Sequence, residues 1–197
     1  MNGYDEFLGT RPVADAHRFD VGALERYLRM HIEGFAGPIE VAQFKGGQSN
    51  PTFVLSTPRK RYVLRRKPPG QLLPSAHAVD REYRVISALA RTDVPVPRTY
   101  CLCTDDAVIG TMFYVMELVE GRVLWDPLLP GMDPAQRRAI FDEMNRVIAS
   151  LHCIDYAALG LETFGKPGNY FGRQIDRWTR QYQASATDTI DAMDRLI

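Results

Sequence analysis

The sequence has few cysteines, and they form neither a disulfide framework nor a recognisable metal site. Only three, Cys101, Cys103 and Cys153, occur among 197 residues. An odd number in a chain of this length argues against a disulfide scaffold. No second Cys or His pair stands at metal-ligand spacing beside Cys101 and Cys103, so we expect no zinc site.

Excess charge and long apolar runs are also missing. Lys plus Arg and Asp plus Glu number 24 each, so the formal net charge is zero. Neutrality argues against a nucleic-acid partner, because binding of the phosphate backbone depends on a basic surface. No apolar stretch approaches the roughly 20 residues that span a bilayer, and the N-terminus has no basic segment followed by an apolar run. We therefore expect a cytoplasmic protein with neither nucleic-acid nor membrane partners.

What remains is the composition of a globular protein, 45% hydrophobic and 24% charged. Residues 1–18 show no periodicity, so we expect a tail there. Apolar spacing and turn residues predict, in order, a helix after Asp20, strands over 39–44, 52–57 and 61–66, a helix over 78–90, and strands over 99–104 and 112–118. From residue 121 onward only helices are predicted, over 135–151, 171–184 and 188–197.

This order of elements indicates an α+β fold in two parts. Residues 19–120 would form a five-stranded antiparallel sheet with a packed helix. Residues 121–197 would form a helical region, and the two parts would share a cleft.

A glycine-rich loop, Gly46-Gly47-Gln48-Ser49-Asn50, separates the first two predicted strands. Paired glycines let backbone N–H groups approach a phosphate closely, and the short polar side chains of Ser49 and Asn50 add donors. The loop matches neither the Walker pattern nor the dinucleotide fingerprint. A simple hairpin turn is the alternative interpretation.

The third predicted strand ends in three basic residues, the first of which is Arg65. Side chains alternate along a strand, so Arg65 shares a face with Val63. A cation fixed there would hold the α- and β-phosphates of a nucleotide; a solvated hairpin end is the alternative. Glu82, 17 residues later in a predicted helix, matches the glutamate that pairs with the strand cation in protein-kinase-like folds. The alternative for Glu82 is an ordinary surface charge.

The last predicted strand, over 112–118, runs into Val119-Glu120-Gly121, where the glycine ends it. This is the arrangement of a kinase hinge, in which main-chain groups hydrogen-bond the edge of adenine. A strand followed by a plain turn is the alternative.

The order and spacing of these features resemble the aminoglycoside phosphotransferase/choline kinase family of protein-kinase-like folds. The stretches that carry the resemblance are Phe44–Phe53, Tyr62–Gly70, Asp80–Val85, the hinge, and Leu151–Asp155. A further set resembles the subgroup found alone or fused ahead of acyl-CoA dehydrogenase domains: Gly168-Asn169-Tyr170-Phe171, Gln174, Arg177-Trp178 and Gln181-Tyr182. The resemblance covers residues 20–197.

The resemblance implies a kinase-like N-lobe followed by an incomplete helical C-lobe. It also implies ATP and magnesium as cofactors and a small-molecule hydroxyl as the phosphate acceptor, with the subgroup pointing to a hydroxyacyl-CoA-type acceptor. Gly46 to Asn50 would cover the phosphates. Arg65 would stand where many relatives have lysine, oriented by Glu82, and its guanidinium would hold phosphate oxygens with a fork rather than a point charge.

At the hinge, the resemblance implies three adenine contacts. Met116 would lie at the back of the adenine pocket. The Glu117 carbonyl and the Val119 N–H would face the adenine edge.

The catalytic loop of the family, a His-Gly-Asp that ends in asparagine, does not occur in these 197 residues. None of the four histidines, His17, His31, His77 and His152, begins such a pattern. In the family the aspartate accepts the proton of the acceptor hydroxyl, while the asparagine and a later aspartate bind magnesium. We therefore expect no catalytic residue and no metal ligand in this chain.

Two functional interpretations stay open. The chain is either the ATP-binding portion of a kinase or a nucleotide-binding or interaction module without catalysis. Apolar helix faces from Ala135 onward would lack partners, so self-association through this surface is expected. His152, on the apolar side of its helix, is interpreted as a packed structural histidine.

Overall fold

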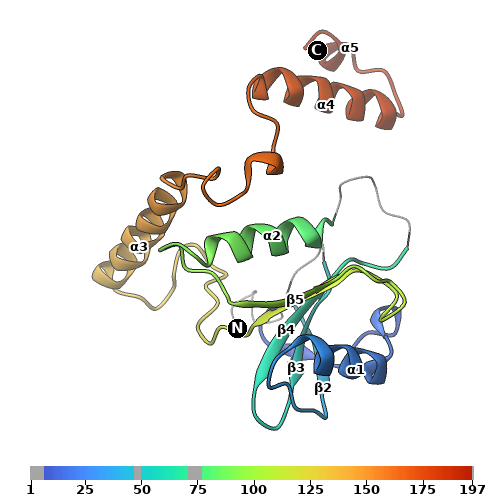
Figure 1. The fold of residues 1–197 in the computed structure, drawn as a ribbon. Helices are drawn as coiled ribbons and strands as arrows, with labels where there is room; N and C mark the ends of the chain where they lie inside the picture. The colour runs from blue at the N-terminus through green and yellow to red at the C-terminus, as the bar shows by residue number, and fades with distance from the viewer. Residues whose placement is uncertain (1–6, 47–49, 71–76, 197) are drawn as a thin grey trace. The chain divides into compact units, whose positions relative to one another are not determined.

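The computed structural model describes residues 7–46, 50–70 and 77–196, and it divides into two compact units, Met1–Gly160 and Leu161–Ile197. The first unit contains the sheet and three helices, and the second contains helices only (Figure 1). The α+β prediction is confirmed. The predicted lobe boundary near residue 120 stays a prediction.

The sheet has six strands, all antiparallel, where five were predicted. Its spatial order is β1 (Thr10–Arg11), β2 (Glu40–Phe44), β3 (Thr52–Ser56), β4 (Arg61–Arg66), β6 (Phe113–Glu117) and β5 (Thr99–Cys103). The sixth strand, β1, comes from the segment predicted to be a tail, and that prediction was wrong. Two residues are too short to show the alternation that reveals a strand, and β1 exists only because it pairs with the edge of β2.

The hydrophobic core lies between the sheet and helix α1 (Val21–His31). Asp20 caps this helix by accepting the backbone N–H of Ala23 at 2.9 Å, which explains why the helix begins there. Strand β4 contributes Tyr62 and Leu64 to this core. Alternation therefore directs the next residues of β4, Val63 and Arg65, to the opposite face, where helix α2 (Val79–Leu89) packs against β5 and β6.

Helix α3 (Pro134–His152) begins at a capping box made by Asp133 and Gln136. The helix buries no residue, and large apolar side chains stay exposed along it: Phe141, Met144, Ile148 and Leu151. His152 is also exposed, so the prediction of a packed histidine was wrong. Its burial was inferred from the apolar residues beside it on the helix, which are exposed in the structure.

The second unit contains a 3-10 turn (Glu162–Phe164), α4 (Tyr170–Ser185) and α5 (Asp191–Asp194). The helix predicted from residue 188 begins later and is only four residues long. Asp188 accepts the backbone N–H of Thr189 at 2.8 Å, a local bond that competes with helix formation. No helix in the described part of the chain is both long and apolar enough to cross a membrane.

Candidate nucleotide-binding site

Arg65 and Glu82 form an ion pair on the face of the sheet that α1 does not cover. Arg65 Nε lies 2.6 Å from Glu82 Oε2, and Arg65 Nη1 donates to Thr52 Oγ1 at 3.1 Å. The pairing predicted from the sequence is confirmed. The two side chains remain 27% and 34% exposed, so the pair contributes little net stability, and its main effect is to fix the direction of the guanidinium.

The Glu82 carboxylate is the shared acceptor of a larger network. Besides Arg65, it accepts from Asn50 Nδ2 at 2.9 Å and from Tyr114 Oη at 3.1 Å. Tyr114 is only 1% exposed. Burial, and then the nearby Glu82 charge, raise the pKa of the Tyr114 hydroxyl, which keeps it protonated as a donor. Three donors from three separate elements therefore hold one carboxylate.

Asn50 extends the network to His77, which lies just before the start of α2. Its Oδ1 lies 2.8 Å from Nδ1 of His77, whose φ of 58° is uncommon for a residue other than glycine. Asn50 is buried, and protein groups provide a partner for both its amide nitrogen and its amide oxygen. The end of the glycine-rich loop is thereby tied to both Glu82 and the approach to α2.

Sequence reasoning missed Tyr114 and His77. Tyr114 stands directly opposite Arg65 in the β4–β6 register, so the strand pairing would have identified it once known. Nothing in the sequence pattern marks His77. It reaches Asn50 because its backbone has a positive φ, and no sequence pattern signals that conformation.

A cavity of about 430 Å³ lies against Arg65. Its lining brings together residues predicted from three separate motifs: Gly46, Arg65, Met116, Glu117 and Val119. Glu82 and Asn50 do not line the cavity, and they act on it through Arg65. Gly47, Gln48 and Ser49 lie outside the described residues.

The outer wall of the cavity comes from segments that sequence analysis did not assign to the site. Phe7 from the N-terminal segment and Trp125 from the segment after the hinge both line it, with ring centroids 5.5 Å apart. A Cβ on Gly46 would lie 2.7 Å from Trp125 Cζ2, so the indole approaches the glycine closely. The pairing of β1 with β2 carries the N-terminal segment to this place.

The cavity combines apolar side chains with one fixed cation. Apolar side chains at one part of the wall, among them Val63, Met116 and Val119, suit a flat base, and Arg65 supplies a fixed cation for phosphate. Across residues 7–46, 50–70 and 77–196, no group of three or more His, Cys, Asp or Glu side chains is placed to hold a metal ion. The cavity thus brings one oriented cation to a largely apolar lining.

Comparison with known proteins identifies the family of this chain. Residues 40–197 match the model of the phosphotransferase enzyme family. The chain belongs to this family. A crystal structure from Ralstonia eutropha, described as a candidate aminoglycoside phosphotransferase, is 61% identical to this chain. The two superpose with a TM-score of 0.76, and the match covers 91% of this chain.

Two curated relatives carry acyl-CoA dehydrogenase names. Acyl-CoA dehydrogenase family member 10 of Mus musculus is 47% identical over 95% of this phosphotransferase-family chain, and family member 11 of Homo sapiens is 46% identical over 93%. The chain spans only 18% and 24% of those two proteins, and 52% of the crystallised one. The partial kinase-like fold is thus shared with larger proteins.

Proposed function

We propose that this chain is the ATP-binding portion of a phosphotransferase that acts on a small-molecule hydroxyl. The observation that carries the proposal is the Arg65–Glu82 ion pair at the wall of the 430 Å³ cavity. The hydrogen-bond network around Glu82 orients the Arg65 guanidinium toward a cavity whose other lining residues are largely apolar. This combination suits a ligand with a flat base and a phosphate chain.

In this proposal the base lies against Val63 and Met116, and the hinge main chain at Glu117 and Val119 meets its edge. Arg65 then holds α- and β-phosphate oxygens through its guanidinium fork. The predicted covering of the phosphates by Gly46 to Asn50 is part of the same proposal. In the family, magnesium would neutralise charge on the phosphates. The sequence pattern that carries its ligands in the family does not occur in these 197 residues.

The acceptor is proposed to be of the hydroxyacyl-CoA type. The support is the sequence subgroup together with the acyl-CoA dehydrogenase names of two relatives. A dehydrogenase and a kinase joined in one polypeptide would act on related molecules, and a hydroxyl on an acyl chain is a group that a kinase phosphorylates.

A non-catalytic nucleotide-binding module is the second candidate. The observation that favours it is the missing His-Gly-Asp loop in these 197 residues. The two candidates share the nucleotide site and differ only in phosphoryl transfer.

Replacing Arg65 by alanine is expected to weaken ATP binding about tenfold to a hundredfold, because a charge-assisted phosphate contact is worth about 1.5–3 kcal/mol. Titration calorimetry with ATP measures this effect. Arg26→Ala, which removes an exposed arginine on α1, is the matched control and should leave the affinity unchanged. Equal affinities of Arg65→Ala and the wild type would contradict the assigned site.

The 197-residue chain itself is expected to show no ATP-dependent phosphoryl transfer, since no general base or magnesium ligand of the family pattern is present. A coupled assay of ADP release with a panel of hydroxyl acceptors tests this expectation. Turnover above background that Arg65→Ala removes would show the expectation to be wrong and would exclude the non-catalytic candidate.

A further inference from the structure

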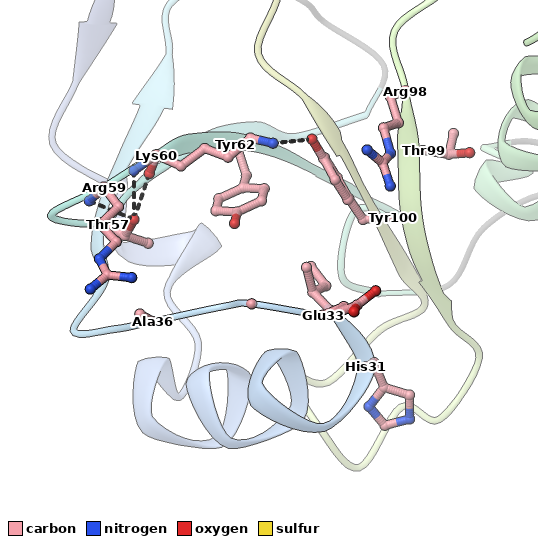
Figure 2. Close-up of a pocket in the computed structure, with 12 residues that line it drawn as sticks. His31, Glu33, Ala36, Thr57, Arg59, Lys60, Tyr62, Arg98, Thr99 and Tyr100 are labelled. Carbon is pink, nitrogen blue, oxygen red and sulfur yellow. Dashed lines mark hydrogen bonds between the residues drawn. The ribbon is translucent and has the colours of Figure 1, made fainter.

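A second cavity, of about 500 Å³, lies on the α1 side of the sheet, away from the face that carries Arg65. The end of α1, the turn between β3 and β4, and the start of β5 form its walls (Figure 2). Tyr62 belongs to its lining, and its neighbour Val63 belongs to the lining of the nucleotide cavity. Alternation along β4 therefore separates the two cavities.

Tyr62 is the feature that points to a ligand. The residue is only 4% exposed, and its ring packs against Phe35 and Tyr100. Its hydroxyl nevertheless makes no hydrogen bond to any residue that the structure describes, and Figure 2 shows it directed into the cavity. The ring is buried while the hydroxyl oxygen keeps access to the cavity, so this group is free to bond an acceptor on a ligand.

Burial raises the pKa of Tyr62, so at neutral pH its hydroxyl remains protonated. The group that faces the cavity is thus a hydrogen-bond donor. An acceptor oxygen on a ligand would satisfy it.

The cavity is also lined by three cations, Arg59, Lys60 and Arg98. In the part of the chain that the structure describes, none of the three forms an ion pair with a carboxylate. The nearby carboxylates are Glu33, which lines the cavity, and Glu117, which accepts the backbone N–H of Arg98 at 3.2 Å. The lining therefore carries a surplus of positive charge in a chain whose net charge is zero.

The cations are positioned by an aromatic side chain. Lys60 Nζ donates to Tyr100 Oη at 2.5 Å, and this bond raises the pKa of Lys60. The Arg98 guanidinium lies 5.3 Å from the centre of the same Tyr100 ring. Tyr100 thereby holds one cation at its hydroxyl and another near its ring.

We propose that this cavity binds a small phosphate-bearing anion, with the Tyr62 hydroxyl as a neutral donor and Lys60 and Arg98 as charged donors. A multivalent oxyanion offers enough acceptor oxygens for a hydroxyl and several cations at once. The volume suits a small phosphate ester or a diphosphate. The inference goes beyond nucleotide binding at Arg65 and does not depend on it.

Inorganic pyrophosphate is the probe, titrated into the full chain and followed by calorimetry and by NMR chemical shifts. Tyr62→Phe, which removes only one oxygen, is expected to weaken pyrophosphate binding about tenfold. The double variant Lys60→Ala/Arg98→Ala is expected to weaken it about a hundredfold or more. In the wild type the shifts should include Tyr62 and Tyr100.

Two controls separate this site from diffuse charge and from the nucleotide cavity. Arg61→Ala removes an exposed arginine of the same hairpin that pairs with Glu120 and does not line the cavity, so the affinity should stay within about twofold of the wild type. Arg65→Ala should leave the shifts at Tyr62 and Tyr100 intact. The proposal is overturned if Tyr62→Phe binds as tightly as the wild type. It is also overturned if Arg61→Ala weakens binding as much as the double variant does, or if the shifts appear only around Gly46 and Arg65.

Discussion

Replacing Glu82 by alanine is expected to weaken ATP binding by up to the same tenfold to hundredfold as Arg65→Ala, and to destabilise the first unit by about 3 kcal/mol. The carboxylate accepts from Arg65, Asn50 and Tyr114, and the last two are buried. Removing it leaves two buried donors without an acceptor, and it leaves the Arg65 guanidinium with the Thr52 hydroxyl as its remaining hydrogen-bond partner among the described residues. The guanidinium then loses its fixed direction toward the cavity, which is the property that ATP binding needs.

Urea unfolding and ATP calorimetry measure the two effects. Glu82→Gln keeps one acceptor oxygen in place. Its unfolding free energy and its ATP affinity should both lie between those of the wild type and those of Glu82→Ala. Asp80→Ala, in the same first turn of α2, tests whether any loss comes merely from an acidic residue at the helix start. Wild-type stability and wild-type ATP affinity in Glu82→Ala would show that the network has no such role.

The elements of the sheet were predictable because their signals are local. Alternating apolar residues and strong turn residues locate β2, β3 and β4 to within a residue, and the Asp20 cap locates the start of α1. The same reasoning could not find β1, whose two residues become a strand only through pairing with β2. It also placed α5 too early, because a local bond at Asp188 was not visible as a pattern.

The candidate site shows the same division. Arg65 and Glu82 were predictable because strand alternation and helix position place them independently of their partners. Tyr114, His77, Phe7 and Trp125 were not, since each reaches the site through contacts between segments distant in sequence. A sequence pattern identifies residues that act along one element, and it misses residues that act across several.

The neighbours Arg65 and Arg66 show why alternation decides the role of a basic residue. Arg65 lines the 430 Å³ cavity, whereas Arg66 is 2% exposed and enters the core. Its Nη1 donates to the Ile109 carbonyl and its Nη2 to the His17 carbonyl, both at 3.1 Å. Burial lowers the pKa of Arg66, because the charged form loses its hydration.

Aromatic rings complete the Arg66 environment. Its guanidinium lies 5.1 Å from the centre of the Phe19 ring and 5.7 Å from that of Phe53. Among the described residues no carboxylate forms an ion pair with it. Arg66 therefore joins the segment around His17 to the β5–β6 connection at Ile109, and its contribution is to folding.

Replacing Arg66 by alanine is expected to destabilise the first unit by about 3 kcal/mol, because it leaves a cavity beside Phe53 and two carbonyls without donors. Arg66→Met keeps the volume of the stem and should cost less, since only the hydrogen bonds are lost. Urea unfolding measures both variants. ATP affinity in the folded fraction should stay at the wild-type value for Arg66→Met, whereas Arg65→Ala should lose affinity with little loss of stability. The opposite pattern, with Arg66→Met weakening ATP and Arg65→Ala lowering the unfolding free energy, would reverse the assignment of the two faces of β4 and with it the location of the nucleotide site.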